Sequence, residues 1–537
     1  MLQRTLALVL ALAGAQLVWA QLVWAQLVGA LLAQAPAGGG TAAPPELPDL
    51  GPPAALPEGA PPHAALIDRN NLRTHAYWLA CDERAGRFTS SKGQNDTARY
   101  VAEHFKKLGL KPLGDKRGFL QNYPLVRTYL DPATSLAFGD QKVTTDFAVL
   151  NDGSAMKVTL SGRFVWCGNG SADQISANLE GKLPLVVLHG LQGGRGAGSD
   201  LQAIQRFLDI SQKLGGRGAS AGVVCLLDDQ GPFGNTLNYK ALLPDHARLE
   251  YGGKGASLQV RVPLFVLSAA HSKRLFAHLG IGLDDNGAPT TEIVNDKATA
   301  KLAIVVKQDP KGQASNVVAV LEGTGKKSEA VVYSAHHDHV GKRLDGDVFN
   351  GADDNASGTA GLLEIAEAYA KGGERPERSI VFLSVSGEEL GLWGSAWFAD
   401  NPTWPLDKIV ADINIDMIGR AGQQNGNILM QVTPSHDHEK YSTIVRDGVA
   451  LGAKFGITFT SGDQYYARSD HYNFAKKDVP VVFFCDGEHP DYHQVTDSAD
   501  RLDYVAMEAI ARLAFWTGWQ VAQDKSRPKE LGKQPQW

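Results

Sequence analysis

Residues 330–341 read AVVYSAHHDHVG and join an apolar run to a cluster of histidines and one aspartate. The run is short, uncharged and rich in aliphatic residues, which is typical of a strand that is buried on both faces. Three further apolar runs follow along the chain: SIVFLSVS (379–386), KIVADINI (408–415) and VPVVFFC (479–485). Together these runs predict the core of a sheet that is covered on both sides.

A helical pattern separates the first two runs. Residues 357–373 read SGTAGLLEIAEAYAKGG, with a serine at the start and glycines at the end. Alternation of strand and helix predicts an α/β fold with a mostly parallel mixed sheet flanked by helices. Upstream, the segment NDTARYVAEHFKKLGLKPLG (95–114) predicts another helix, with Val101 and Phe105 on one face and Gly109 at its end.

Acidic or imidazole side chains follow each of the four runs. They are His336 and Asp338 after the first, Glu388 and Glu389 after the second, Asp416 after the third, and Asp486, Glu488, His489 and His493 after the fourth. In an open α/β sheet, ligands bind beyond the carboxyl ends of the strands, so we expect these side chains to converge at one edge. The segment NGADDNASG (350–358) adds Asp353 and Asp354 after the first strand.

Histidines and carboxylates without a thiolate form a ligand set that suits zinc or a similar divalent ion. Several carboxylates with only two or three histidines fit a two-metal centre, in which a carboxylate bridges ions roughly 3.5–4 Å apart. Glu388 and Glu389 should point in different directions in an extended stretch. One of them can therefore bind metal while the other faces the water that attacks the substrate.

Spacing alone does not decide which histidine of the cluster binds metal, because alternate residues of an extended chain share a side. A metal-bound histidine usually donates its other ring N–H to a carboxylate, which fixes its tautomer. Asp338 can orient His336 in this way, whereas His337 and His339 have no such partner in the segment. We expect His336 to be the ligand and the other two histidines to be packing or pocket-rim residues.

The composition sets limits on the possible partners. The chain has 537 residues, 43% of them hydrophobic and 20% charged, with a net charge of −6. This length is enough for two or more domains with their own cores, and the acidic balance argues against nucleic acid as a partner. The four cysteines are widely separated and form no CxxC pair, which argues against a cysteine-type zinc site.

The N-terminal segment has the pattern of a secretory signal. Residues 1–35 place one arginine before a long uncharged run with small residues at its end. We expect export to a periplasmic or extracellular location, with no stable membrane span after cleavage. The run is long enough to cross a bilayer, so an uncleaved signal anchor is the alternative. Residues 36–65 are rich in Pro, Ala and Gly and predict an extended linker.

Five segments together resemble peptidase family M28, the co-catalytic zinc aminopeptidases and their relatives. They are SAHHDHVG, NGADDNASG, SGEELGLWGS, INIDMIG and DYHQVTDSADRLDY, in this order. Residues 138–295, with KLPLVVLHG and GGRGASAGVVCLLDD, resemble the small β-rich α/β protease-associated (PA) domain that is often inserted in this family. The resemblance implies a peptidase domain in two parts, 66–137 and 296–525, followed by a C-terminal tail, 526–537.

The resemblance also implies roles for individual residues. His336, Asp354, Glu389, Asp416 and His493 match the ligands of two zinc ions, and Asp354 matches the bridging carboxylate. Asp338 matches the partner of the first histidine. Glu388 matches the general base, and Tyr492 matches a residue that steadies the oxyanion in some relatives.

The implied function is that of an exported di-zinc aminopeptidase, which removes N-terminal residues from peptides or proteins with metal-activated water. A glutaminyl cyclase-like transferase shares this fold and is one alternative. A binding protein that works through the PA domain, with a vestigial peptidase domain, is another. A carboxypeptidase for acidic tails is a third, and it would need a basic pocket; only Arg468 and Arg420 lie near the motifs.

Overall fold

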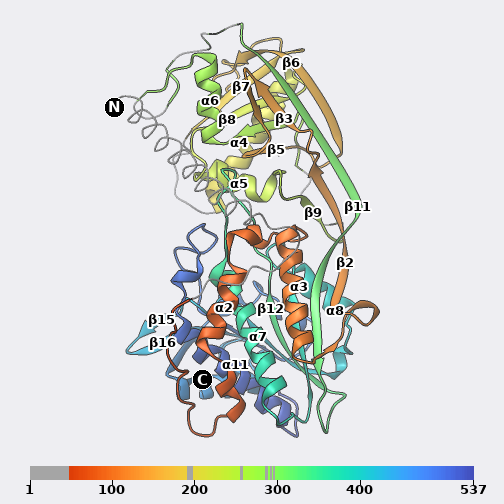
Figure 1. Cartoon of the computed structure of the whole chain (residues 1–537), viewed down its shortest axis with the longest axis vertical. Coiled ribbons are helices and arrows are strands. Elements are labelled where there is room, and N and C mark those ends of the chain that lie inside the picture. The colour runs from red at the N-terminus through yellow and green to blue at the C-terminus, as the bar shows by residue number, and fades with distance from the viewer. Residues whose placement is uncertain are drawn as a thin grey trace, which may run out of the picture. The chain divides into compact units, whose positions relative to one another are not determined.

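The structure is a computed structural model, and it describes residues 47–189, 197–253, 258–284, 288–290, 293, 295 and 297–537 (Figure 1). Residues 49–537 form one compact unit. The predicted signal peptide, 1–35, and the predicted linker as far as residue 46 lie outside the described residues. In the part of the chain that is described, no helix combines the length and the apolar character needed to cross a bilayer.

A mixed sheet forms the centre of the unit. Its strands lie in the order β11–β13–β12–β14–β18–β16–β17, and the four strands from β13 to β18 run parallel to one another. The bounds are β11 Thr299–Leu321, β12 Ala330–His336, β13 Ser379–Val385, β14 Ile409–Ile415, β16 Asn427–Thr433, β17 Ile457–Ser461 and β18 Val481–Cys485. Two short strands, β1 (Lys111–Pro112) and β15 (Gly422–Gln424), pair with β11 and β16. The predicted α/β class with a mostly parallel mixed sheet is confirmed.

The four predicted runs become the four parallel strands, and every residue of β12, β13, β14 and β18 is buried. Successive side chains of a strand point to opposite faces. On β12, Val331 and Tyr333 belong to a core shared with α7 and α11, whereas Val332 belongs to a second core with Phe398 and Phe474 on the other face. The sheet is therefore the middle layer of three.

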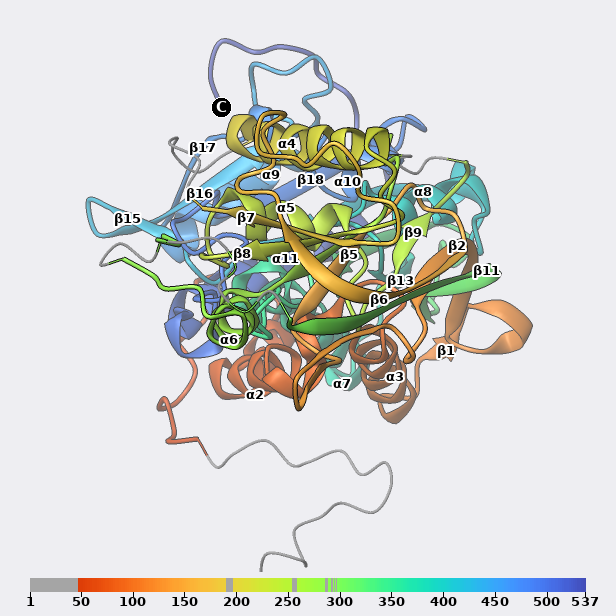
Figure 2. The same ribbon diagram turned by 90° about the horizontal axis from the view of Figure 1, so that it is seen from above.

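Helices cover both faces of this sheet. On the first face lie α2 Arg69–Leu79, α3 Lys92–Lys107, α7 Gly358–Lys371, α9 Thr443–Gly452 and α11 Tyr504–Gln523. On the second lie α8 Trp393–Asp400 and α10 His471–Ala475. Figures 1 and 2 show α2, α3 and α7 side by side, in agreement with their shared core.

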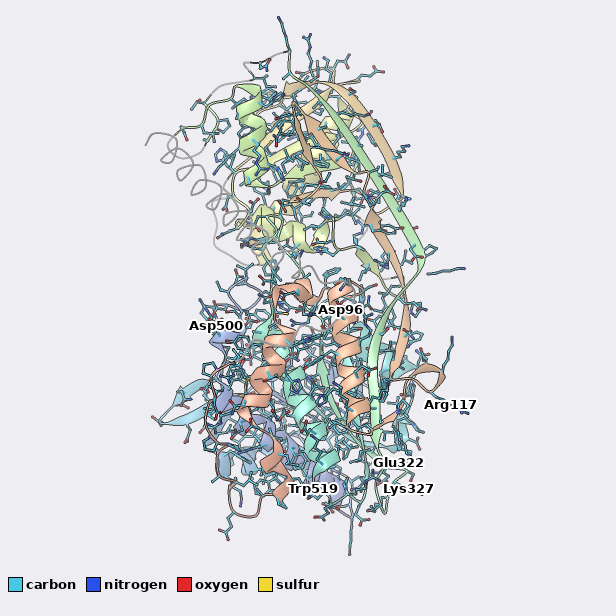
Figure 3. All side chains as sticks on the ribbon, in the orientation of Figure 1. Asp96, Arg117, Glu322, Lys327, Asp500 and Trp519 are labelled. Atoms are coloured by element: carbon cyan, nitrogen blue, oxygen red, sulfur yellow. The ribbon has the colours of Figure 1, made fainter. Side chains whose placement is uncertain are left out.

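The helix predicted within 95–114 corresponds to α3. Val101 and Phe105 are fully buried, and Gly109 follows the helix with a φ of +73° that favours glycine. The outer side of α3 is charged: Asp96, labelled in Figure 3, pairs with Lys92 at 2.6 Å and Arg84 at 3.5 Å. Helix α3 therefore buries its apolar face and carries charged residues on the opposite face, as the sequence pattern predicts.

The end of the predicted linker packs against the helices. Pro62–Leu66 forms the short 3₁₀ helix η1, in which His63 and Ala64 are buried. The ring of His63 lies 4.9 Å from that of Trp519 on α11, which Figure 3 labels. Arg512 of the same helix donates hydrogen bonds to the carbonyl oxygens of Ala54 and Ile67. The final residues of the Pro-rich segment therefore contribute to the core.

Residues between the two parts of the central fold form a second sheet, in the order β6–β7–β8–β10–β5. Its bounds are β5 Phe147–Leu150, β6 Met156–Trp166, β7 Leu183–Leu188, β8 Gly222–Leu226 and β10 Leu264–Leu267, with helices α4 Ala197–Gly216, α5 Pro232–Lys240 and α6 Ala269–Leu279. The remaining strands are β2 Leu120–Leu130, β3 Ser135–Phe138, β4 Gln141–Val143 and β9 Arg248–Glu250. Hydrophobic clusters lie on both faces of this sheet. Its identity as a PA domain stays a prediction.

Candidate metal centre

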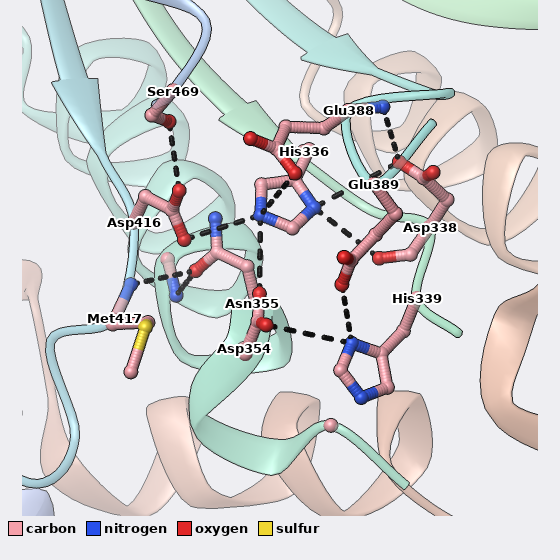
Figure 4. Close-up of polar contacts among 12 residues, drawn as sticks. His336, Asp338, His339, Asp354, Asn355, Glu388, Glu389, Asp416, Met417 and Ser469 are labelled. Atoms are coloured by element: carbon pink, nitrogen blue, oxygen red, sulfur yellow. Dashed lines mark hydrogen bonds and ion pairs between the residues drawn. The ribbon is translucent and has the colours of Figure 1, made fainter. Parts of the chain in front are cut away.

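The carboxyl ends of the parallel strands bring the predicted site residues together (Figure 4). His336 is the last residue of β12, and Glu388 and Glu389 follow β13 after a short turn. Asp416 directly follows β14, and His493 lies in the loop after β18. Side chains far apart in the sequence thus meet at one edge of the sheet, as expected for an open α/β fold.

The potential ligand atoms form two groups. One consists of His336, Glu388 and Asp416, and the other of His339, Asp354, Glu389 and His493; within each group, the ligand atoms lie within 4.8 Å of one another. In the first group, Nε2 of His336 lies 3.1 Å from Oδ1 of Asp416 and 3.9 Å from Oε2 of Glu388. In the second, Nε2 of His493 lies 3.1 Å from Oε2 of Glu389.

Asp354 lies between the two groups. Its Oδ1 is 3.3 Å from Nε2 of His336, and its Oδ2 is 3.0 Å from Nε2 of His493. One carboxylate therefore presents one oxygen to each group, which is the arrangement that a bridging ligand needs. Asp354 is held in place because its main-chain N–H and that of Asp353 donate to the buried carboxylate of Asp497.

Asp338 contacts two members of the first group, His336 and Glu388. The Nδ1 atom of His336 lies 3.2 Å from the main-chain oxygen of Asp338 and 3.7 Å from its carboxylate. That carboxylate accepts hydrogen bonds from Oγ1 of Thr89 at 2.7 Å and from the main-chain N–H of Glu388 at 3.3 Å. With Nδ1 turned toward Asp338, Nε2 of His336 faces the centre of the site.

The two adjacent glutamates have opposite proton affinities. Burial raises the pKa of Glu388 well above its ordinary value; His336 opposes this, and the charges of Glu389 and Asp416 reinforce it. Burial and Asp354 also act to raise the pKa of Glu389, but His493 and a hydrogen bond with His339 hold that pKa at about 2. Glu389 is therefore suited to stay charged as a ligand, and Glu388 to accept and release a proton.

Hydrogen bonds from a neighbouring loop fix the side chain of Asp416. Oγ of Ser469 donates to Oδ2 of Asp416 at 2.7 Å, and Nδ2 of Asn414 donates to the same Oγ at 2.7 Å (Figure 4 shows the first contact). The side-chain oxygen of Asn355 accepts the main-chain N–H of Met417 at 3.2 Å. The loops that carry Asp354 and Asp416 are thus tied to each other.

His337 and His339 differ in their surroundings. His337 is fully buried away from the carboxylates, with Nδ1 2.8 Å from Oγ of Ser384 and Nε2 2.8 Å from Nε2 of Gln94. His339 is also fully buried, but its Nδ1 lies 2.7 Å from Oε1 of Glu389. The sequence interpretation gave His339 no part in the centre, whereas the structure places it against a candidate ligand.

The buried side chain of Arg87 was also missed. Its guanidinium donates to the carbonyl oxygens of His337 at 3.0 Å and Gly351 at 2.8 Å, and so joins the histidine segment to the segment that carries Asp354. Burial lowers its pKa, and the carboxylates of Asp354 and Asp497 oppose that effect. Arg87 lies about 250 residues upstream of these segments, in a stretch without a recognisable motif.

A pocket opens beside the two groups. Three of the candidate site residues, Asp354, Glu388 and Asp416, line it; its other lining residues are Met417, Tyr465, Arg468, Phe483, Cys485, Gly487, Glu488 and Tyr492. Part of the wall is apolar and aromatic, and Arg468 and Glu488 in the same wall form an ion pair of 2.6 Å. Burial and nearby carboxylates raise the pKa of Tyr492, so its hydroxyl stays protonated and can donate a hydrogen bond.

The side chains fit a pair of divalent ions of the zinc type. The donors are imidazole nitrogens and carboxylate oxygens, which zinc accepts. A buried cluster of carboxylates this close together is costly unless cations compensate the charge. Fold and site together therefore define an α/β protein with a candidate two-metal centre at the carboxyl edge of its sheet.

Residues 316–517 match the model of peptidase family M28. This part of the chain, which holds every candidate ligand, is similar to the peptidases of family M28. The match agrees with the resemblance inferred from the sequence motifs.

Known proteins of this kind share part of the chain. A probable zinc metalloprotease of Pyrenophora tritici-repentis is 25% identical over 264 residues, which cover 40% of this chain and 53% of that protein. Aminopeptidase YwaD of Bacillus subtilis is 24% identical and covers 48% and 54%. A probable glutamate carboxypeptidase of Arabidopsis thaliana is 24% identical over 461 residues and covers 76% and 61%. The chain spans about half the length of the first two relatives.

Among solved structures, a zinc aminopeptidase from Bacillus subtilis has a similar fold, with a TM-score of 0.51. The two are 16% identical in sequence, and the likeness covers 86% of this chain and 97% of that one. At this identity, the comparison concerns the fold alone.

Proposed function

We propose that this chain is a zinc-dependent aminopeptidase with two zinc ions. The observation that carries the proposal is the position of Asp354, whose two oxygens face His336 and His493 at 3.3 and 3.0 Å. The match to peptidase family M28 supports hydrolysis as the reaction. The relatives named as aminopeptidases support the choice of peptide substrates.

The residues divide into two ligand sets that share Asp354. His336 and Asp416 would hold one ion, and Glu389 and His493 would hold the other. Bound zinc supplies Lewis-acid chemistry, because it polarises a carbonyl group and makes water acidic enough to react near neutral pH. Four of these residues are tied by further contacts: Asp338 and Thr359 contact His336, Ser469 contacts Asp416, Asp497 holds Asp354, and His339 contacts Glu389.

Glu388 acts as the general base in this proposal. Its carboxylate lines the pocket, 3.9 Å from Nε2 of His336, and its raised pKa favours uptake of a proton. It removes a proton from the attacking water and later delivers a proton to the leaving amine. The protonated hydroxyl of Tyr492 donates to the oxygen that becomes negative when water adds to the peptide carbonyl.

The pocket favours an apolar N-terminal residue. Phe483, Met417, Tyr465 and Cys485 all line the pocket and belong to one hydrophobic cluster. A basic pocket for acidic tails is not supported, because Arg468 pairs with Glu488 at 2.6 Å and Arg420 with Asp491 at 3.0 Å. Among the described residues of this pocket, no cation is free to bind an acidic tail. The pocket therefore does not support the activity of the probable glutamate carboxypeptidase that the chain resembles.

Export is a further part of the proposal, supported by the pattern of residues 1–35. The substrates are then free N-termini of peptides or proteins outside the cytoplasm. In this proposal, residues 138–295 are a PA domain that accompanies the peptidase region.

The proposal is tested with the purified full-length protein and leucine p-nitroanilide. We expect release of nitroaniline, loss of activity after removal of metal with a chelator, and recovery when zinc is returned. Glu388→Gln should show no recovery. Activity that survives complete removal of metal would overturn the metallopeptidase proposal.

A further inference from the structure

His339 lies beside the second ligand set, although the family resemblance assigns it no role. Its side chain is fully buried, and its Nδ1 lies 2.7 Å from Oε1 of Glu389. Figure 4 shows this contact as a dashed line between the two side chains. A buried imidazole held against a candidate ligand is either a ligand itself or a group that orients one.

The distances favour orientation. Two ligand atoms bound to one tetrahedral zinc at about 2.0–2.1 Å lie roughly 3.3 Å apart. The 2.7 Å between Nδ1 of His339 and Oε1 of Glu389 is shorter than this and matches a charge-assisted N–H···O⁻ hydrogen bond. The next carboxylate oxygen, Oδ2 of Asp354, is 3.7 Å from Nδ1, beyond hydrogen-bond range. His339 therefore donates its Nδ1–H to Glu389.

The two oxygens of Glu389 then have separate partners. Oε1 accepts from His339, and Oε2 faces His493 at 3.1 Å. Because Oε1 is engaged, the carboxylate is turned so that Oε2 is the oxygen available beside His493 and Asp354. This arrangement selects one oxygen of Glu389 as the donor to a metal ion.

The backbone fixes the ring of His339 in this position. Its main-chain N–H donates to the carbonyl oxygen of Arg87 at 3.2 Å, and Phe88 pairs with His339 in an isolated β-bridge. The ring packs on Gly351, where a Cβ atom would lie only 2.4 Å from Cδ2 of the imidazole. Gly351 has a φ of +54°, so the backbone there also favours glycine.

We infer that His339 is a positioning residue that orients Glu389 for the metal ion it shares with His493 and Asp354. The inference rests on the two-zinc function proposed above. It assigns His339 to one ion of the pair only, because no contact joins it to Asp416, and His336 lies in the other group. Hydrogen-bond partners of metal ligands typically contribute 10- to 100-fold to metal affinity.

The test measures zinc binding rather than turnover. The metal-free full-length protein is titrated with zinc against a chromophoric chelator, and the two dissociation constants are fitted. We expect His339→Leu to weaken one of the two sites by roughly 10- to 100-fold and to leave the other unchanged. His339→Asn should restore most of the affinity, because its Nδ2–H can replace the Nδ1–H donor.

His337→Asn is the matched control, since His337 is equally buried in the same segment but contacts Ser384 and Gln94. It should keep both affinities. Two sites of wild-type affinity in His339→Leu would overturn the inference, and so would complete loss of one ion in both His339 variants, which would make His339 a ligand. Fewer than two ions bound by the wild type would overturn the two-zinc proposal itself, and the inference with it.

Discussion

Glu388 and Glu389 are adjacent in the sequence, but their carboxylates belong to different groups of the centre. Oε2 of Glu389 lies 3.1 Å from His493, whereas Oε2 of Glu388 lies 3.9 Å from His336. The pKa of Glu388 is raised above its ordinary value, and that of Glu389 is lowered to about 2. Neighbouring carboxylates with pKa values moved in opposite directions are the pattern of a proton carrier beside a charged ligand.

Glu388→Gln should therefore retain two zinc ions and lose most of its turnover. General-base assistance is worth roughly 10²- to 10⁴-fold, so we expect kcat to fall by at least that range. The measurements are kcat on a leucyl substrate and zinc content by plasma mass spectrometry. Turnover near that of the wild type in the fully loaded variant would remove Glu388 from the mechanism.

Asp354→Asn should disturb both metal ions, because each of its oxygens faces a different group. We expect less than one zinc ion per chain after dialysis against metal-free buffer, while the wild type keeps two. Asp416→Asn is the comparison, since Asp416 lies in one group only; it should keep one ion. An Asp354→Asn protein with two tightly bound ions would contradict the bridging role.

Glu488→Gln should widen the specificity of the pocket toward acidic N-terminal residues. The change leaves Arg468 without its partner at 2.6 Å, so its charge becomes available to a substrate carboxylate. The ion pair is half-exposed, and we expect the ratio of kcat/KM for glutamyl over leucyl anilides to rise only about three- to tenfold. The double variant with Arg468→Gln should show no gain; an unchanged ratio in Glu488→Gln would exclude Arg468 from specificity.

His104 should make the fold sensitive to acid. Burial, with smaller effects from His75 and Lys107, lowers the pKa of His104 from 6.5 to about 3. The unfolded chain therefore binds a proton between pH 6.5 and 3 that the folded chain does not, so stability falls as pH falls through this window. One such proton amounts to about 1.4 kcal/mol per pH unit.

His104→Gln removes this proton from the unfolded state. The slope of unfolding free energy against pH, measured by urea denaturation between pH 6 and 4.5, should decrease by roughly one proton relative to the wild type. An identical slope in both proteins would show that His104 takes up its proton in the folded state as well.

The parallel strands could be predicted from the sequence because burial on both faces leaves a continuous apolar run. Strand β12 starts at Ala330 and ends at His336, in close agreement with the predicted run. The convergence of His336, Asp416 and His493 then follows from strand direction, since parallel strands end at the same edge. Prediction of this shared edge required only the order of strands and helices along the chain.

The role of His339 could not be predicted by the same reasoning. Grouping His337 and His339 as two packing or pocket-rim residues assumed that both lie on one side of an extended chain, but β12 ends at His336. The two histidines consequently reach different partners, Gln94 and Glu389. Arg87 could not be predicted because long-range hydrogen bonds from a buried guanidinium to carbonyl oxygens leave no local pattern.

Mass spectrometry of two peptide digests tests the central claim most directly. The purified protein is incubated with a peptide that has a free N-terminal leucine and with its N-acetylated form. The proposal predicts that the free peptide is shortened from its N-terminus by one residue at a time, while the acetylated peptide stays intact. If instead only N-terminal glutaminyl peptides react, losing ammonia while keeping their length, the aminopeptidase proposal is wrong and a cyclase takes its place.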